Sequence, residues 1–312
     1  MNIPSIVELA GVFENPGAAL RYLQMHGVVE VPENCSNPVC AGQMRVYNVQ
    51  KPYLYRCTRK RTCGRYLSVY KDTFFGSTRL PANKVLLIAY LWLTKSLNTS
   101  IMTQVGASAN SVTNWANHLR TLVTWDIENL DIDHAAIGGE GIIVEIDESK
   151  FGKRKFNRGH RVEGVWVVGG VERTPERLMF AVSVQDRSAE TLRAIIQRHV
   201  LPGTIVRTDL WRGYRALDDF GMEHQTVNHT DHFVDPVTGV HTNTIEGTWN
   251  GMKMNTRRQH YNREFIDGAL MEFIWRRRYA GDLWNRLLHA MRHVMYADDD
   301  VNDENVDPNI ML

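Results

Sequence analysis

Residues 141–147 read GIIVEID, a run of β-branched and aliphatic side chains that closes on an acidic residue. Two similar runs follow, GVWVV at 164–168 and LMFAVSV at 178–184. Short apolar runs rich in Val and Ile are typical of buried strands. The three runs therefore predict three strands of one sheet.

A helix and a fourth strand follow these runs. Ser188 can cap a helix that extends to about His199, and TIVRT at 204–208 predicts a strand that ends at Asp209. A further helix can begin near Thr244. This order of strands and helices predicts an α/β layer built around a mixed sheet.

Three acids lie where strand ends and a packed helix would bring carboxylates together. Asp147 and Asp209 close two of the predicted strands, and Glu246 falls near the start of the later helix. Carboxylate oxygens in that arrangement bind Mg²⁺ or Mn²⁺. Two ions about 3.5–4 Å apart can activate a water or a 3′-hydroxyl for phosphoryl transfer. The pattern favours these three acids as catalytic residues and metal ligands.

Other residues compete for these roles, because an acid that closes a strand is commonly a turn former or a helix cap. Glu145 is the main competitor, since alternation puts it on the same strand face as Asp147. The weaker candidates are the acids Asp186, Asp231 and Asp235, with His229 and His241 as groups beside a metal ligand.

Several polar residues are candidates for DNA contact. Glu246, Trp249, Asn250 and Lys253 are spaced to share one helix face, so Lys253 could hold a phosphate beside the acids. Basic clusters can also contact phosphates, although they are more commonly solvated faces. The candidates in or near this part of the chain are Lys153, Arg154, Lys155, Asn250, Lys253, Arg257 and Arg258.

All four cysteines lie in one short window, Cys35, Cys40, Cys57 and Cys63. Two cysteine pairs separated by a strand pair are typical of a zinc ribbon, and residues 44–56 are β-prone with a predicted Lys-Pro turn at Lys51. Two disulfides or unligated core thiols are the alternatives, and disulfides are disfavoured without a secretory signal. We expect a structural Zn²⁺, distinct from the catalytic metals.

A helical segment follows the ribbon. Residues 81–97 predict a buried helix, and a short helix to Val105 leads through a small-residue turn to a second helix from about Ser111. Helix, tight turn and helix with a polar outer face is the helix-turn-helix pattern, and an ordinary helical hairpin is the alternative. The polar residues expected to contact DNA are Asn114, Asn117 and His118.

Composition and charge set broad limits. A chain of 312 residues with 43% apolar content suggests two globular domains. The net charge is +1, but residues 296–312 hold six acids and no Lys or Arg, so the remainder carries +7. The apolar run at 85–93 is too short to span a membrane. With no secretory signal at the N-terminus, we expect an intracellular protein with no membrane partner.

Four stretches together resemble the Merlin-superfamily transposases, a eukaryotic cut-and-paste family similar to bacterial insertion-sequence transposases with an N-terminal zinc ribbon. The most specific stretches are VEIDESKFGKRK (144–155), RTDLWRGY (207–214) and VHTNTIEGTWNGMK (240–253), and residues 55–81 are similar too. The resemblance runs from about Cys35 to Arg292. The chain departs from the family at CSNPVC (35–40), where four residues replace the usual two between the cysteines.

The resemblance implies a ribonuclease-H-like catalytic domain with an Asp-Asp-Glu triad at Asp147, Asp209 and Glu246. It also implies binding of double-stranded DNA at terminal inverted repeats, hydrolytic nicking, strand transfer into target DNA and action as a homo-oligomer. The implied location is nuclear if the source is eukaryotic and cytoplasmic otherwise. The alternatives are a domesticated DNA-binding protein that keeps the scaffold without transposition, and a zinc-ribbon adaptor for protein partners.

The expected domain organisation has five parts. They are an N-terminal segment (1–33), the zinc ribbon (34–79), a helical DNA-binding segment (80–135), the catalytic domain (140–295) and an acidic disordered tail (296–312).

Overall fold

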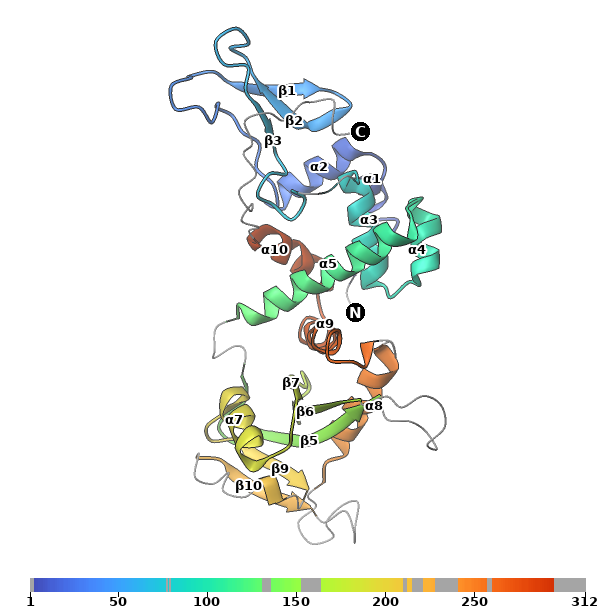
Figure 1. The fold of residues 1–312 in the computed structure, drawn as a ribbon, viewed down its shortest axis with the longest axis vertical. Helices are drawn as coiled ribbons and strands as arrows, with labels where there is room; N and C mark the ends of the chain where they lie inside the picture. The colour runs from blue at the N-terminus through green and yellow to red at the C-terminus, as the bar shows by residue number, and fades with distance from the viewer. Residues whose placement is uncertain are drawn as a thin grey trace. The chain divides into compact units, whose positions relative to one another are not determined.

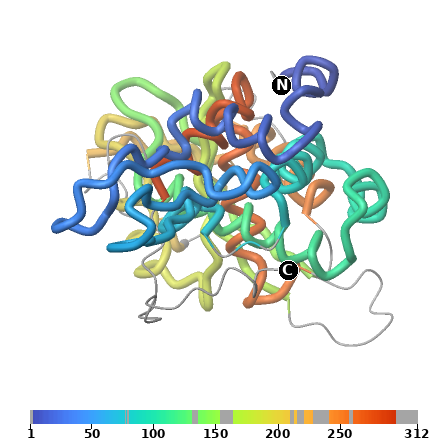
Figure 2. Tube along the Cα trace, turned by 90° about the horizontal axis from the view of Figure 1, so that it is seen from above, coloured from blue at the N-terminus to red at the C-terminus, as the bar shows by residue number. Residues whose placement is uncertain are grey.

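The computed structural model describes residues 3–76, 78, 80–130, 136–152, 164–209, 212–214, 221–227, 241–256 and 260–294; Figures 1 and 2 draw the remainder in grey. By its internal contacts the chain divides into two compact units. One holds residues 1–122 with 281–312, and the other holds residues 123–280. The bounds of the five expected parts stay predictions.

The second unit is built on a five-stranded mixed sheet of order β10-β9-β5-β6-β7. Its strands are β5 (Ile143–Phe151), β6 (Val165–Glu172), β7 (Met179–Val184), β9 (Ile205–Asp209) and β10 (Glu223–Val227). Strands β5, β6 and β7 are antiparallel neighbours, whereas β9 runs parallel to β5 and β10 runs parallel to β9. The expected α/β layer around a mixed sheet is confirmed.

Helices cover both faces of this sheet (Figure 1). Helix α7 (Ala189–His199) packs through Leu192 and Ile196 against the face that carries Val144 and Ile146. Helices α8 (Asn243–Asn255) and α9 (Ile266–Arg278) pack against the opposite face. Alternation along β5 therefore directs its odd-numbered residues toward α8. Two short strands, β4 (Ile137–Gly138) and β8 (Val200–Leu201), pair beside the sheet.

Two expectations about the strands need correction. Strand β5 does not end at Asp147 but continues to Phe151, because residues 148–151 keep their pairing with β6. Strand β10 was not expected from the sequence: its residues EHQTV are mostly polar, and of them only Val227 is fully buried at the edge of the sheet.

The first unit contains the cysteine-rich strands and most of the helices. Helices α1 (Ala10–Phe13), α2 (Pro16–Met25) and α10 (Leu283–His293) belong to it, and the Trp284 indole of α10 donates to the Tyr22 hydroxyl at 2.8 Å. Strands β1 (Met44–Asn48), β2 (Lys51–Cys57) and β3 (Tyr66–Ser68) form an antiparallel sheet. The expected Lys-Pro turn is wrong, because Asn48 accepts the N–H of Gln50 at 2.8 Å and turns the chain before Lys51.

The three expected helices are present, but the first ends at Leu93 and not at Leu97, because Lys95 takes a left-handed φ of +59°. The third continues past residue 122 into the second unit. Helix α3 (Ala82–Leu93) is almost wholly buried, α4 (Asn98–Val105) is short, and α5 (Ala109–Glu128) follows it. Gly106 turns the chain between α4 and α5 with φ +63°, a left-handed conformation that favours glycine. Along α5 the apolar face is buried at Val112, Leu119, Leu122 and Val123, as its spacing predicts.

Candidate functional site

The parallel pairing of β5 and β9 aligns Asp147 with Asp209. Glu145 and Arg207 are register partners, and Asp147 and Asp209 each follow two residues later. The two acids therefore occupy equivalent positions toward the carboxyl ends of neighbouring parallel strands. Asp209 is the last residue of β9, whereas Asp147 lies inside the longer β5.

Helix α8 runs along β5 through three matched contacts, which we call the β5–α8 ladder. Glu145 accepts the N–H of Ile245 at 3.0 Å, Asp147 Oδ2 accepts the Trp249 indole N–H at 3.0 Å, and the Lys253 ammonium donates to Ser149 Oγ at 2.6 Å. Two strand residues span about 6.7 Å and four helix residues about 6 Å, so the repeats nearly match. The ladder fixes the register of the helix that carries Glu246.

Glu145, the main competitor for the triad, has a different place in the structure. Its side chain is fully buried, and Oε2 accepts the N–H groups of Thr244 at 2.7 Å and Ile245 at 3.0 Å. Its other oxygen lies 3.6 Å from Arg173 and 3.5 Å from His241. Glu145 therefore caps the N-terminus of α8 and forms an ion pair with Arg173. Of the two predicted histidines, His241 lies beside Glu145, and His229 lies outside the described residues.

The three predicted catalytic acids are electrostatically close. Burial raises the pKa of Asp147, and the negative charges of Asp209 and Glu246 raise it further. The N–H groups of Glu148 and Trp249 act in the opposite direction. Glu246 is exposed in the first turn of α8, and Asp209 is half-buried. Asp209 on β9 and Glu246 on α8 thus lie near enough to Asp147 on β5 for their charges to act on it.

A further part-buried acid, Glu148, lies on the other face of β5 and was not expected from the sequence. The buried Tyr214 hydroxyl donates to Glu148, and Arg187 lies 3.8 Å from the same carboxylate. Arg187 also stacks on Trp166, 3.7 Å from the ring centroid. Burial raises the pKa of Glu148, and Asp147 and Asp209 raise it further. Alternation along β5 could have indicated this acid, because it places Glu148 opposite Asp147.

Of the weaker acidic candidates, the structure describes only Asp186, which does not belong to the site. Asp186 is exposed and accepts the N–H of Ser188 and the Thr191 hydroxyl, so it stabilises the start of α7. Asp231 and Asp235 lie outside the described residues.

The structure describes five of the ten residues that the sequence predicts to contact DNA. Asn114, Asn117 and Asn250 are exposed, and Lys253 is half-buried beside Ser149. His118 is half-buried, with its ring stacked on Phe74 at a centroid distance of 4.7 Å. Five predicted contacts, Lys153, Arg154, Lys155, Arg257 and Arg258, lie outside the described residues.

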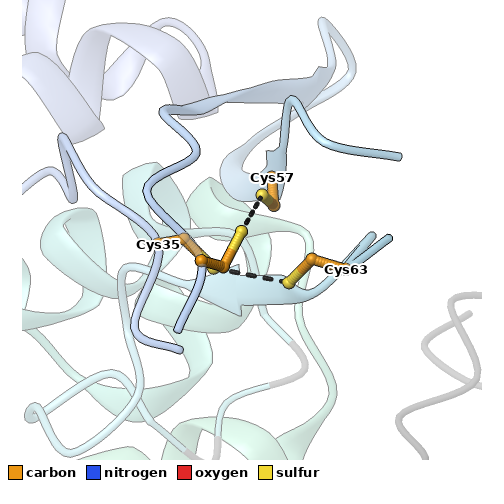
Figure 3. A group of neighbouring side chains, drawn as sticks. Cys35, Cys57 and Cys63 are labelled. Carbon is orange, nitrogen blue, oxygen red and sulfur yellow. Dashed lines mark hydrogen bonds between the residues drawn. The ribbon is translucent and has the colours of Figure 1, made fainter. Parts of the chain in front are cut away.

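The four cysteines form a closed group in the other unit. Their sulfur atoms all lie within 4.8 Å of one another, and each is a free thiol (Figure 3). The sulfurs of Cys35 and Cys63 are 3.6 Å apart, as are those of Cys40 and Cys57. Within the described ranges this is the one tight cluster of potential metal ligands; the carboxylates of the triad are not gathered as closely.

The backbone around the cysteines is arranged for sulfur ligands. Cys35, Cys57 and Cys63 each accept a backbone N–H from two residues later. The Arg65 N–H lowers the pKa of Cys63 to about 7, whereas burial raises the pKa of Cys57 to about 11. Gly42 leaves the space that the sulfurs use, since a Cβ there would lie 2.6 Å from Cys57 Sγ. The group can hold a metal ion.

No helix in the part of the chain that the structure describes is long and apolar enough to cross a membrane.

Residues 128–277 match the model of the ISXO2-like transposase domain. An uncharacterised transposase-like protein of Haemophilus influenzae is 33% identical over 101 residues, which cover 31% of this chain and 79% of that protein. A solved pre-cleavage Mos1 transpososome is 8% identical, with a TM-score of 0.20 over 70% of this chain and 81% of that one. Because the H. influenzae relative is bacterial, the nuclear location finds no support.

Proposed function

The chain belongs to the DDE transposases, in the ISXO2-like family, and we propose that it cuts and joins DNA with Asp147, Asp209 and Glu246 as its metal-binding triad. The observation that carries the proposal is that Asp209 on β9 and Glu246 on α8 lie near Asp147 on β5, where their negative charges both raise its pKa. The ladder and the strand register hold that arrangement.

The triad suits two Mg²⁺ or Mn²⁺ ions. Three carboxylates carry like charges and therefore repel one another. Mg²⁺ and Mn²⁺ prefer hard oxygen ligands of this kind. When bound, the ions would activate the attacking water or 3′-hydroxyl and stabilise the departing oxygen. Asp147 and Asp209 would hold ligand positions on neighbouring strands, and Glu246 would complete the set from the exposed first turn of α8.

Lys253 and Asn250 would hold the DNA beside these acids. Asn250 is exposed, and the Lys253 ammonium lies on the same side of β5 as Asp147, through its bond to Ser149. Burial lowers the pKa of Lys253 and the Asp147 charge raises it. A cation beside the acids suits a scissile phosphate.

A structural zinc ion suits the cysteine group. A tetrahedron with metal–sulfur bonds of about 2.3 Å has sulfur–sulfur edges of about 3.8 Å, close to the 3.6 Å separations of the two pairs. A disulfide would need about 2.05 Å. The longer spacing between Cys35 and Cys40 is compatible with this geometry.

The remaining parts of the proposal rest on the family. We infer a ribonuclease-H-like catalytic domain, supported by the antiparallel β5–β6–β7 meander that two parallel strands extend. The zinc ribbon and the α4–α5 helix-turn-helix would bind the terminal inverted repeats, through exposed residues such as Asn114 and Asn117. Action as a homo-oligomer on transposon ends and target DNA completes the proposal.

The test is cleavage of a duplex that carries the inverted repeats flanking the gene. With Mg²⁺, the purified protein should nick this duplex at the repeat end. An Asp209→Asn variant should bind it without cutting, whereas Asp186→Asn, which changes an exposed acid outside the site, should cut like the parent. Cleavage by Asp209→Asn at the parental rate would refute the triad.

A further inference from the structure

In the β5–α8 ladder, Trp249 is the residue of α8 that contacts a carboxylate of the proposed triad. Its indole N–H donates to Asp147 Oδ2 at 3.0 Å. The ring is 4% exposed and packs edge-on against Phe151, with centroids 6.2 Å apart. A buried ring of this size has little freedom, so its N–H has a fixed direction.

Gly169 provides the space for that ring. It is the register partner of Asp147 on β6. A Cβ at Gly169 would lie 2.6 Å from Cη2 and 3.1 Å from Cζ2 of Trp249. The backbone of Gly169 is not in the left-handed region, so any residue could adopt its conformation. A glycine is required there because a side chain would overlap the indole of Trp249. Any larger residue would push the indole away from β6.

We propose that Trp249 and Gly169 form a positioning pair for Asp147: the glycine admits the indole, and the indole N–H fixes the carboxylate that binds the metal. This inference rests on the proposed function, because it assigns Asp147 as a metal ligand. Neither residue is itself a catalytic residue.

An indole suits this task for chemical reasons. It is a hydrogen-bond donor only, so it orients a carboxylate without competing for the metal. It also carries no charge, so the carboxylate keeps its full negative charge for the ion. Groups that orient a metal ligand in this way commonly contribute 10- to 100-fold to metal affinity.

The adjacent glycine supplies a matched control. Gly170 is also buried on β6, and a Cβ there would lie 2.4 Å from Cε1 of Phe180. That overlap is on the α7 face, away from Trp249. Gly169→Ala and Gly170→Ala therefore both overpack the sheet, and only the first displaces the indole.

The experiment follows the indole and the metal in the zinc-loaded full-length chain. The chain has eight tryptophans, so ¹⁵N-labelled indoles give one N–H signal each, and Trp249→Phe identifies the signal of Trp249. Mg²⁺ should shift this signal. Gly169→Ala should move it toward the position of an unbonded indole, and Gly170→Ala should leave it in place.

Mn²⁺ affinity is measured in parallel by the electron paramagnetic resonance of the free ion. Gly169→Ala and Trp249→Phe should each weaken binding by about 10- to 100-fold, and Gly170→Ala should not. The double variant Gly169→Ala/Trp249→Phe separates packing from hydrogen bonding. Phe lacks the overlapping ring atoms, so thermal stability should recover while Mn²⁺ affinity stays low.

Two results would overturn the inference, and they are distinguishable. If Asp147→Asn loses Mn²⁺ while Gly169→Ala and Trp249→Phe bind it like Gly170→Ala, the positioning pair is wrong and the triad stands. If Asp147→Asn binds Mn²⁺ like the parent, the proposed function fails and the positioning pair fails with it.

Discussion

Glu145 accepts the backbone N–H of Ile245 at 3.0 Å across 100 residues of sequence. Through this bond, a residue of strand β5 caps the N-terminus of helix α8, which packs on that strand. The helix's own N-cap residue, Thr242, makes no side-chain cap bond. Because Glu246 is the next residue, the cap sets the position of the third triad acid.

Replacing Glu145 should therefore destabilise the sheet-bearing unit. Glu145→Leu leaves two helix N–H groups and Arg173 without their buried acceptor. We expect the free energy of unfolding to fall by about 3 kcal/mol or more, and by less in Glu145→Gln, which keeps an acceptor oxygen. Urea unfolding measures both, with the exposed Glu190→Gln as control. A loss in Glu145→Leu no larger than in that control would contradict the cap.

The space at Gly42 should be required for the metal in the ribbon. A Cβ there would lie 2.6 Å from Cys57 Sγ and 3.3 Å from Cys40 Sγ, so alanine must displace two ligands. We expect Gly42→Ala to purify with less than one zinc per chain. Elemental analysis measures this, and Gly11→Ala, which meets nothing within 4 Å, is the control. Full zinc content in Gly42→Ala would count against the site.

Tyr214 should stabilise the fold through Glu148. Tyr214→Phe removes the hydroxyl that donates to this part-buried carboxylate, at an expected cost of about 1–3 kcal/mol. Glu148→Gln should cost less, because its amide oxygen still accepts the bond. Chemical denaturation of the two variants provides the comparison, and the reverse order would show that the bond contributes little.

His199 should make stability depend on pH. Burial, together with the charge of Arg198, lowers the pKa of His199 to about 4, against about 6.5 in an unfolded chain. Between these values the unfolded chain binds a proton that the folded chain does not. The stabilisation is complete above about pH 6.5 and is lost as the pH falls toward about 4.

His199→Phe keeps the stack on Phe180, whose centroid is 5.0 Å away, and removes the titration. The fall in unfolding free energy between about pH 7.5 and about pH 5 should be smaller in His199→Phe than in the parent. Equal falls would mean that His199 is protonated equally in both states.

The sequence predicted the elements whose signal is local. The runs at 141–147, 164–168 and 178–184 are strands, and the helix after Ser188 is present because its cap and apolar spacing lie within the segment. Asp147 and Asp209 could be paired because parallel strands align their carboxyl ends.

Features that depend on partners far along the chain could not be predicted. Strand β10 is polar and exists by pairing with β9, and β5 extends past Asp147 because β6 pairs with it. Alternation correctly placed Glu145 beside Asp147, yet its role as a cap depends on α8, about 100 residues away. The Trp249–Gly169 contact likewise appears only when β6 and α8 are packed together.

Metal-specific rescue tests the central claim most directly. A thiolate is a poor ligand for Mg²⁺ and a better one for softer ions such as Mn²⁺. Asp209→Cys should therefore bind the inverted-repeat duplex, fail to cut it with Mg²⁺, and regain cutting with Mn²⁺. Asp186→Cys should cut with either ion. Asp209→Cys that cuts equally well with both ions, or with neither, would contradict the assignment of Asp209 as a metal ligand.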